Sequence, residues 1–198
     1  MVRLERTKTM IRRISSFPAL ALLLFLLPAA TAAAEEAVID LGEPGVLVLP
    51  LPKDWSHDVS PAGADKPPTA ELRAADSDTI VLVTPFWAHD GAEPDYGTAD
   101  SVRRVVERSA AEIASGAADR ELKILPIGAD RIGFMFFATD KSLVGRAPPP
   151  GEYKYLLQGA VMIGKLLCTF TYLTNEKSSA NIGRTLEVML NATHRTGA

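Results

Sequence analysis

The sequence predicts an α+β fold, in which an antiparallel β-sheet of about six to seven strands carries helices packed on it. Segments with the period of a strand and segments with the period of an amphipathic helix follow one another as three strands, a helix, four strands and a helix. Of the 198 residues, 47% are hydrophobic and 23% are charged. This composition is typical of a globular domain and excludes disordered, collagen-like and coiled-coil chains.

The first three predicted strands lie in the N-terminal half of the chain. Residues 45–50 form a short apolar run between Pro44 and Pro50, which is typical of a buried strand. Residues 69–74 alternate between apolar and polar side chains, whereas residues 79–86 are β-branched and apolar on both faces. Because the turn residues 76–78 separate these two segments, we expect them to form a hairpin.

A helix is predicted at residues 99–117, where apolar side chains recur every three or four residues and charged side chains occupy the other side. Thr98 or Asp100 can cap its first turn, and Gly116 lies near its end. Residues 122–127 and 132–139 are then expected to be two further strands.

The C-terminal part predicts a second hairpin and a last helix. Residues 153–164 and 165–173 are apolar and alternate, with a turn near Gly164, and residues 179–193 show a helical stripe. In the closing strand, Cys168 shares one face with Phe170 and Tyr172. We expect this single cysteine to be a buried small hydrophobe, because a lone cysteine cannot form an intrachain disulfide.

Two short motifs resemble those of a known family. The run Val46-Leu47-Val48-Leu49-Pro50-Leu51-Pro52-Lys53-Asp54-Trp55 resembles the opening strand and Pro-x-x-Trp turn of PsbP-like domains. The run Ile163-Gly164-Lys165-Leu166-Leu167, placed before a terminal helix, resembles their closing hairpin. The resemblance covers most of residues 45–194 and implies an α/β/α sandwich.

The same resemblance implies a role in protein binding. PsbP-like domains occur in photosystem extrinsic subunits, in a Ran-binding nuclear protein and in bacterial envelope proteins, and those with a known role bind other proteins and are not enzymes. No functional residue is transferred, because the family has no shared catalytic signature.

The N-terminus has the order of a signal peptide: basic residues, the apolar run 19–27, and the small residues 29–34 before Glu35. We therefore expect residues 1–34 to be a cleaved signal peptide and residues 35–198 to be a single α+β domain. The protein is expected to be periplasmic or secreted. A stable membrane anchor is not expected, because the run is far shorter than the roughly 20 residues of a spanning helix and Pro28 interrupts it.

Charge limits the classes of partner. Residues 1–34 contain five basic residues and one acidic residue, so their removal changes the net charge from −3 to −7. Nucleic acids and anionic lipid surfaces bind clusters of Lys and Arg, so a chain of this charge is not expected to bind them. The expected partner is another envelope protein, and the sequence leaves the oligomeric state open.

A repeated tetrapeptide is the most specific local feature of the chain. It comprises Trp55-Ser56-His57-Asp58 and Trp87-Ala88-His89-Asp90. If both segments follow strands that run in the same direction, they emerge at the same end of the sheet. The side chains of His57, Asp58, His89 and Asp90 would then suit zinc or another divalent metal, and Trp55 and Trp87 would form an apolar rim for a ligand or partner. The alternative is that the two tryptophans simply close the rim of the sheet.

No catalytic motif accompanies these residues. Aspartates and a glutamate in the same two segments could serve a hydrolase, but no serine or cysteine stands in a nucleophile motif and no glycine-rich phosphate loop occurs. The sequence therefore favours an exported, non-catalytic accessory or protein-binding domain of the bacterial envelope, which needs no cofactor. The alternatives are a small-molecule or divalent-metal-binding module at the Trp-x-His-Asp segments and, less favoured, a hydrolase there.

The expected export can be tested on the native protein. Because the apolar run is too short to remain as an anchor, osmotic shock should release a protein that begins at Glu35 or Ala33. Intact-mass measurement of the released protein identifies this N-terminus. A membrane fraction that retains residues 19–30 would contradict the prediction.

Overall fold

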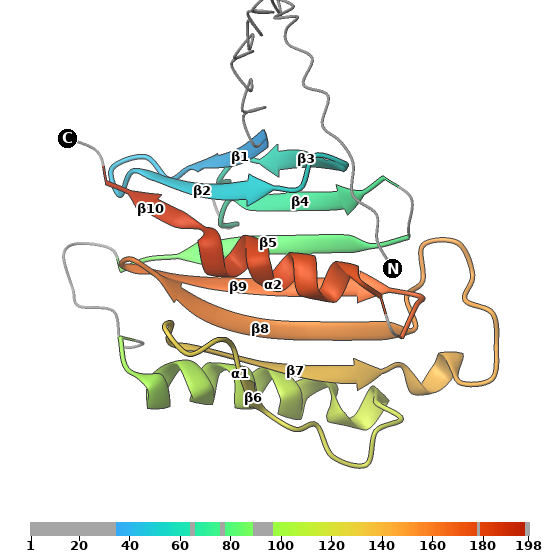
Figure 1. Ribbon diagram of the computed structural model, residues 1–198. Coiled ribbons are helices and arrows are strands. Elements are labelled where there is room, and N and C mark those ends of the chain that lie inside the picture. The colour runs from blue at the N-terminus through green and yellow to red at the C-terminus, as the bar shows by residue number, and fades with distance from the viewer. Residues whose placement is uncertain (1–34, 64–65, 76–77, 89–96, 178, 197–198) are drawn as a thin grey trace, which may run out of the picture. The chain divides into compact units, whose positions relative to one another are not determined.

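Two antiparallel sheets form the framework of the chain. In the computed structural model, residues 35–196 are described except for 64–65, 76–77, 89–96 and 178. A seven-stranded sheet has the strand order β3-β4-β5-β9-β8-β7-β6, and a three-stranded sheet has the order β1-β2-β10 (Figure 1). Every pair of neighbouring strands is antiparallel. The predicted α+β class is therefore confirmed.

The elements have the following bounds. The seven-stranded sheet consists of β3 (Trp55–Ser60), β4 (Thr69–Ala74), β5 (Ile80–Phe86), β6 (Leu125–Pro126), β7 (Gly133–Thr139), β8 (Tyr155–Ile163) and β9 (Leu166–Thr174). The three-stranded sheet consists of β1 (Glu35–Asp40), β2 (Val46–Leu51) and β10 (Thr193–Arg195). The helices are α1 (Ala99–Ile113) and α2 (Asn181–Asn191), with short 3-10 turns at η1 (Ala114–Gly116) and η2 (Lys141–Leu143).

Both predicted hairpins are confirmed. β4 pairs with β5, and β8 pairs with β9 across the two-residue turn Gly164-Lys165, where Gly164 has a φ of 60°. A positive φ is readily adopted only by glycine, so this residue permits the tight turn. The helix predicted at residues 99–117 is also confirmed, and Thr98 is its N-cap: its Oγ1 accepts a hydrogen bond from the Ser101 N–H at 3.2 Å.

Three strands were not predicted, and one predicted strand is shorter than expected. β1, β3 and β10 are short or rich in polar residues, so their alternation is weak. The expected strand at 122–127 is reduced to the two residues of β6. The last helix ends at Asn191 rather than at residue 193, because Thr193 pairs with Val48 of β2. The Arg131 guanidinium supports this ending by donating a hydrogen bond to the Ala192 carbonyl at 3.0 Å.

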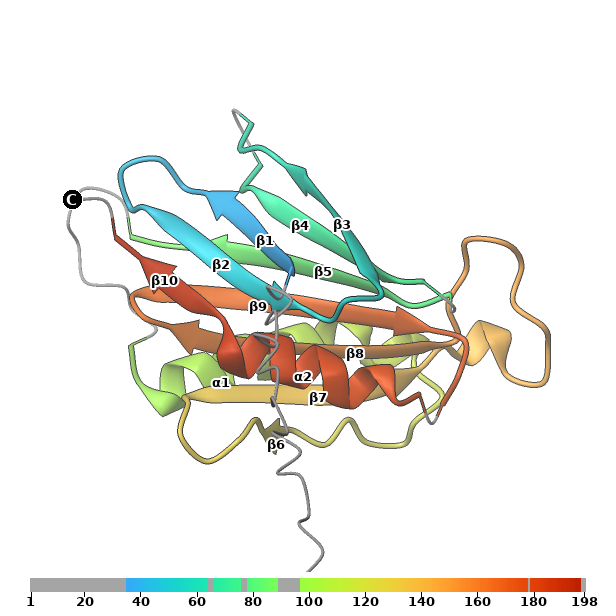
Figure 2. The same cartoon turned by 45° about the horizontal axis from the view of Figure 1, so that its top comes forward.

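The two faces of the seven-stranded sheet are covered by different layers. α1 packs on one face over β7 and β8, whereas α2 and the three-stranded sheet cover the opposite face (Figures 1 and 2). The larger apolar core lies beneath α2 and the small sheet and includes Leu49, Val81, Phe170 and Met189. A smaller core lies beneath α1 and includes Val106, Phe136 and Leu167. None of the helices in the described part of the chain is long and apolar enough to cross a membrane.

The closing strand has the predicted orientation. Cys168, Phe170 and Tyr172 point into the larger core, and each is at most 1% exposed. Burial raises the pKa of the Cys168 thiol, because an apolar surrounding disfavours the thiolate. The expectation of a buried small hydrophobe at Cys168 is therefore met by its position.

Gly159 provides a test of the packing in the middle of the sheet. Gly159 is the cross-strand neighbour of Phe170, and a Cβ atom at this position would lie 2.6 Å from the Phe170 ring and from the Phe134 carbonyl oxygen. Gly159→Ala should therefore lower the free energy of unfolding by about 1 to 3 kcal/mol, the usual cost of overpacking. Denaturant titration measures this change.

Gly183 in α2 is the matched control. No heavy atom lies within 4 Å of a Cβ atom built there. Gly183→Ala should raise the free energy of unfolding by up to about 1 kcal/mol, because alanine is the better helix former. A neutral Gly159→Ala variant would contradict the close contact with Phe170.

Candidate functional site

The structure places the first Trp-x-His-Asp segment in a strand. Trp55, His57 and Asp58 belong to β3, which pairs with β4, so the segment does not form a loop after a strand. The apolar run before it, β2, belongs to the three-stranded sheet. In the second segment, Trp87 follows β5, whereas His89 and Asp90 lie outside the described residues.

The described residues of the two segments, Trp55 to Asp58 and Trp87, do not meet at one end of the sheet. His57 pairs with Leu72, and Leu72 pairs with Val81, so His57 lies level with the start of β5. Trp87 follows the end of β5, six residues beyond Val81, and six residues of extended strand span about 20 Å. The prediction assumed that both segments follow strands, but the first segment is itself the strand. The two tryptophans are thus at opposite ends of the sheet.

Trp55 is a core residue and not a rim for a ligand. Its side chain is only 2% exposed and belongs to the larger core. The Arg184 guanidinium of α2 lies over the indole, 5.4 Å from the ring centroid, and its Nη1 donates a hydrogen bond to Asp54 Oδ2 at 2.8 Å. The contacts of Arg184 with the Trp55 ring and with Asp54 therefore connect α2 to the start of β3. Trp87 is half-buried and packs against the same core.

The metal ligands expected from the sequence are not assembled in the described residues. His57 Nδ1 lies 3.8 Å from Glu35 Oε1 of β1, and Asp58 lies on the other face of β3. In the described ranges, no group of three His, Cys, Asp or Glu side chains is arranged to hold a metal ion. In the part of the chain that the structure describes, His57 and Asp58 therefore lie in no group of three metal-binding side chains.

A groove lies between the C-terminal end of α1 and the strands beneath it. Its volume is about 460 Å3, which falls in the usual range of ligand-binding pockets. Apolar side chains of α1 and three strands line it, together with charged or polar residues at its margin: Ile113, Ala117, Ala138, Leu156, Leu173, Glu112, Asp140, Tyr153 and Lys154. The groove offers an apolar floor with charges of both signs beside it.

The groove continues onto a part of the sheet that no described element covers. On the face that carries α1, the cross-strand pairs Ile80–Leu173, Leu82–Thr171 and Thr84–Thr169 of β5 and β9 are all half-buried. The apolar side chains of α1 pack with residues of β7 and β8 and with Leu167 of β9, and none of these three pairs belongs to that cluster. These six residues are called the open face below, and Leu173 belongs to both the groove and the open face.

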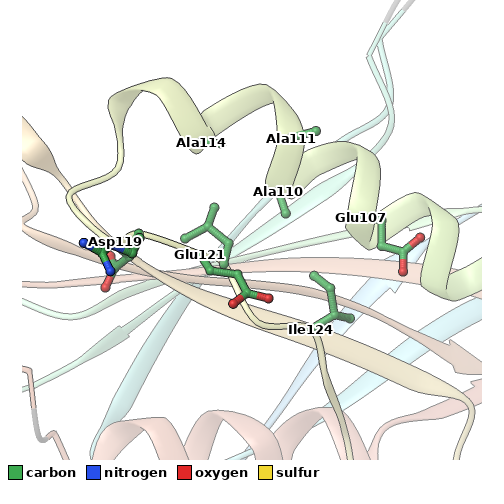
Figure 3. A pocket seen from close by; sticks show the side chains of 9 residues that line it. Glu107, Ala110, Ala111, Ala114, Asp119, Glu121 and Ile124 are labelled. Carbon is green, nitrogen blue, oxygen red and sulfur yellow. The ribbon is translucent and has the colours of Figure 1, made fainter.

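A second, smaller hollow lies between α1 and residues 119–124. Its volume is about 280 Å3, and Figure 3 shows Ala110 and Ala114 of α1 on one side with Glu121 and Ile124 on the other. Asp119 is engaged in the fold, because its Oδ2 accepts a hydrogen bond from the Thr139 N–H at 2.6 Å. This hollow is less apolar than the groove.

The groove and the open face were not recognised from the sequence. Their residues come from segments that are far apart in the chain, so no local sequence motif indicates these surfaces. One signal was present: residues 79–86 are apolar on both faces, which normally indicates a strand that is covered on both sides. The structure covers one face of β5 only, in the part of the chain that it describes.

Together, the two sheets and the helices on opposite faces define an α+β sandwich. The chain is similar to the solution structure of cyanobacterial PsbP (CyanoP) from Synechocystis sp. PCC 6803. The two share 14% sequence identity over 84% of this chain and 96% of that chain, with a TM-score of 0.47. This similarity concerns the fold alone. No protein-family model and no curated protein sequence matches the chain.

The contact between Asp54 and Arg184 predicts a pH dependence of stability. Hydrogen bonds from Arg184 hold the pKa of the Asp54 carboxyl below its ordinary value. A lowered folded-state pKa contributes stability above the unfolded-state pKa of about 3.9, and this contribution is lost as the pH falls through the folded-state value. Asp54→Asn should therefore lower the Tm at neutral pH, and the difference from wild type should shrink below about pH 4.

Thermal melts between pH 2 and pH 7 measure this dependence. Glu43→Gln is the control, because Glu43 is an exposed acidic residue in the loop between β1 and β2. A Tm difference for Asp54→Asn that stays constant across this pH range would show that the ion pair is not its cause.

Proposed function

We propose that the chain is an exported, non-catalytic accessory domain of the bacterial cell envelope that binds another envelope protein. The observation that carries the proposal is the open face. Ile80, Leu82 and Leu173 lie on a sheet face that no described element covers, although the sequence of β5 is apolar on both faces. These three side chains are half-buried, so part of their apolar area is still accessible and can be buried by a partner protein.

The chemistry of the open face suits a protein partner. Apolar side chains of Ile80, Leu82 and Leu173 alternate with three threonines, and Thr69 Oγ1 lies 3.0 Å from Thr84 Oγ1. A surface that combines apolar area with hydroxyl groups can exclude water at its centre and still satisfy polar groups, as protein interfaces do. The groove beside it can receive a protruding side chain of the partner.

The expected net charge of the exported chain supports the same class of partner. With residues 1–34 removed, the charge is −7, which disfavours phosphate backbones and anionic lipids. The apolar run 19–27 and the small residues after it support export into the periplasm or beyond the cell.

Site-specific cross-linking in the native cells tests the proposal. A photoreactive benzoylphenylalanine at Thr171, in the middle of the open face, should produce a discrete cross-linked adduct with another protein. The same residue at Val38 should not produce it, because Val38 is 46% exposed in β1 but lies away from the open face.

A second variant separates a specific interface from chance proximity. Leu82→Lys places a charge next to Thr171, so it should abolish the adduct formed from position 171 while far-UV circular dichroism stays unchanged. Val38→Lys should leave the adduct intact. An adduct that forms equally from positions 171 and 38, or that persists in Leu82→Lys, would contradict a partner on the open face.

A further inference from the structure

β3 forms one edge of the seven-stranded sheet and leaves one side of its backbone unpaired. It is hydrogen-bonded to β4 on one side, and in the described part of the chain no strand pairs with its other side (Figures 1 and 2). β1 lies near β3 at Glu35 and His57 but pairs with β2. Ser56, His57 and Asp58 are exposed.

The pairing with β4 determines which backbone groups are free. The Ala75 N–H donates to the Asp54 carbonyl at 3.0 Å, so Asp54 and Ala75 form a hydrogen-bonded pair. Because such pairs alternate along an antiparallel ladder, Ser56, Asp58 and Ser60 point their backbone groups toward β4. The N–H and C=O groups of His57 and Val59 therefore point outward, and no described residue forms a hydrogen bond with them.

The two edges of the sheet differ in a way that favours β3 as a docking edge. β6, at the opposite edge, has two residues and ends in Pro126, and short strands and proline are the usual protection of a sheet edge. β3 has six residues in unbroken register from Trp55 to Ser60 and no proline. An extended segment can therefore add to β3 as a further antiparallel strand.

The charged side chains beside this edge favour an incoming segment that carries a positive charge. Asp58 lies directly opposite Glu71 on one face of the pair, and Glu35 lies 3.8 Å from His57 on the other face. Glu71 is ion-paired with Arg73 on the same face, whereas no basic side chain in the described part of the chain forms an ion pair with Asp58. A cation of the incoming segment opposite Asp58 would therefore form a favourable cross-strand pair with it. On the outer side Asp58 occupies a non-hydrogen-bonded position, where cross-strand side chains are closest.

We propose that β3 receives an extended segment of a partner protein as an additional antiparallel strand, with a Lys or Arg opposite Asp58 and an apolar residue opposite Val59. The apolar neighbour would contact Val59, which is half-buried and packs against the larger core. This inference rests on the proposed function in that the ligand is a protein, but it concerns a different surface from the open face.

Fluorescence anisotropy with two labelled decapeptides tests the inference. Valine alternates with threonine in both, and one central threonine is replaced by lysine in the first peptide and by glutamate in the second. The lysine peptide should bind the chain saturably, and the glutamate peptide should bind about fivefold more weakly, the size expected for one cross-strand charge pair. Asp58→Lys should reverse this order.

Val59→Pro tests the role of the backbone. Proline removes the Val59 N–H, which points away from β4, so the ladder between β3 and β4 is kept. Binding of the lysine peptide should be lost in Val59→Pro and retained in Val59→Ala, while thermal melts show both variants folded. Unchanged binding in folded Val59→Pro, or no binding of the lysine peptide to the wild type, would overturn the inference.

Two further results separate the inference from its alternatives. A wild-type dimer that is lost in Val59→Pro, measured by sedimentation, would identify a second copy of the chain as the occupant of the edge and would overturn the inference. Leu82→Lys should keep peptide binding, because it alters the open face alone. If cross-linking from position 171 persists while the lysine peptide fails to bind, the β3 inference is rejected and the proposed function stands.

Discussion

The contact between the Phe170 ring and the backbone of Gly159 is the constraint on which the rest of the structure depends. The absence of a side chain at Gly159 lets the Phe170 ring of β9 lie against the backbone of β8, since a Cβ atom there would be 2.6 Å from the ring. Phe170 then lies at the centre of the larger core, beneath α2 and the three-stranded sheet. The same close packing brings β8 and β9 into one continuous surface, on which both outer layers rest.

The uneven cover of the sheet follows from the length and position of α1. α1 has 15 residues, and its apolar side chains pack on Phe136 of β7, Ala160 of β8 and Leu167 of β9. The neighbouring strands β5 and β9 keep half-buried apolar and threonine side chains on that face. The groove at the end of α1 and the open face are thus continuous, and together they mark the limit of the cover that the described residues provide on this side of the sheet.

The proposed docking edge depends on how the start of β3 is held in the fold. Trp55 is buried, and Arg184 of α2 contacts both its ring and Asp54. These contacts fix the start of β3, and β4 pairs with the strand along its length, so the outward-pointing backbone groups of His57 and Val59 belong to an extended strand. The open face and the β3 edge therefore differ in chemistry: the first offers apolar side chains, and the second offers backbone groups with carboxylates beside them.

The sequence by itself determined the α+β class, both hairpins, α1 and the inward orientation of Cys168, Phe170 and Tyr172, because these depend on local periodicity and turn residues. It did not reveal β1, β3 or β10, since these strands are short or rich in polar residues, and β10 pairs with β2, which is distant in the chain. The tryptophans of the Trp-x-His-Asp segments were misplaced because β3 was not recognised as a strand. A repeated tetrapeptide shows that two segments are alike, but only the pairing of β3, β4 and β5 decides that Trp55 and Trp87 lie at opposite ends of the sheet.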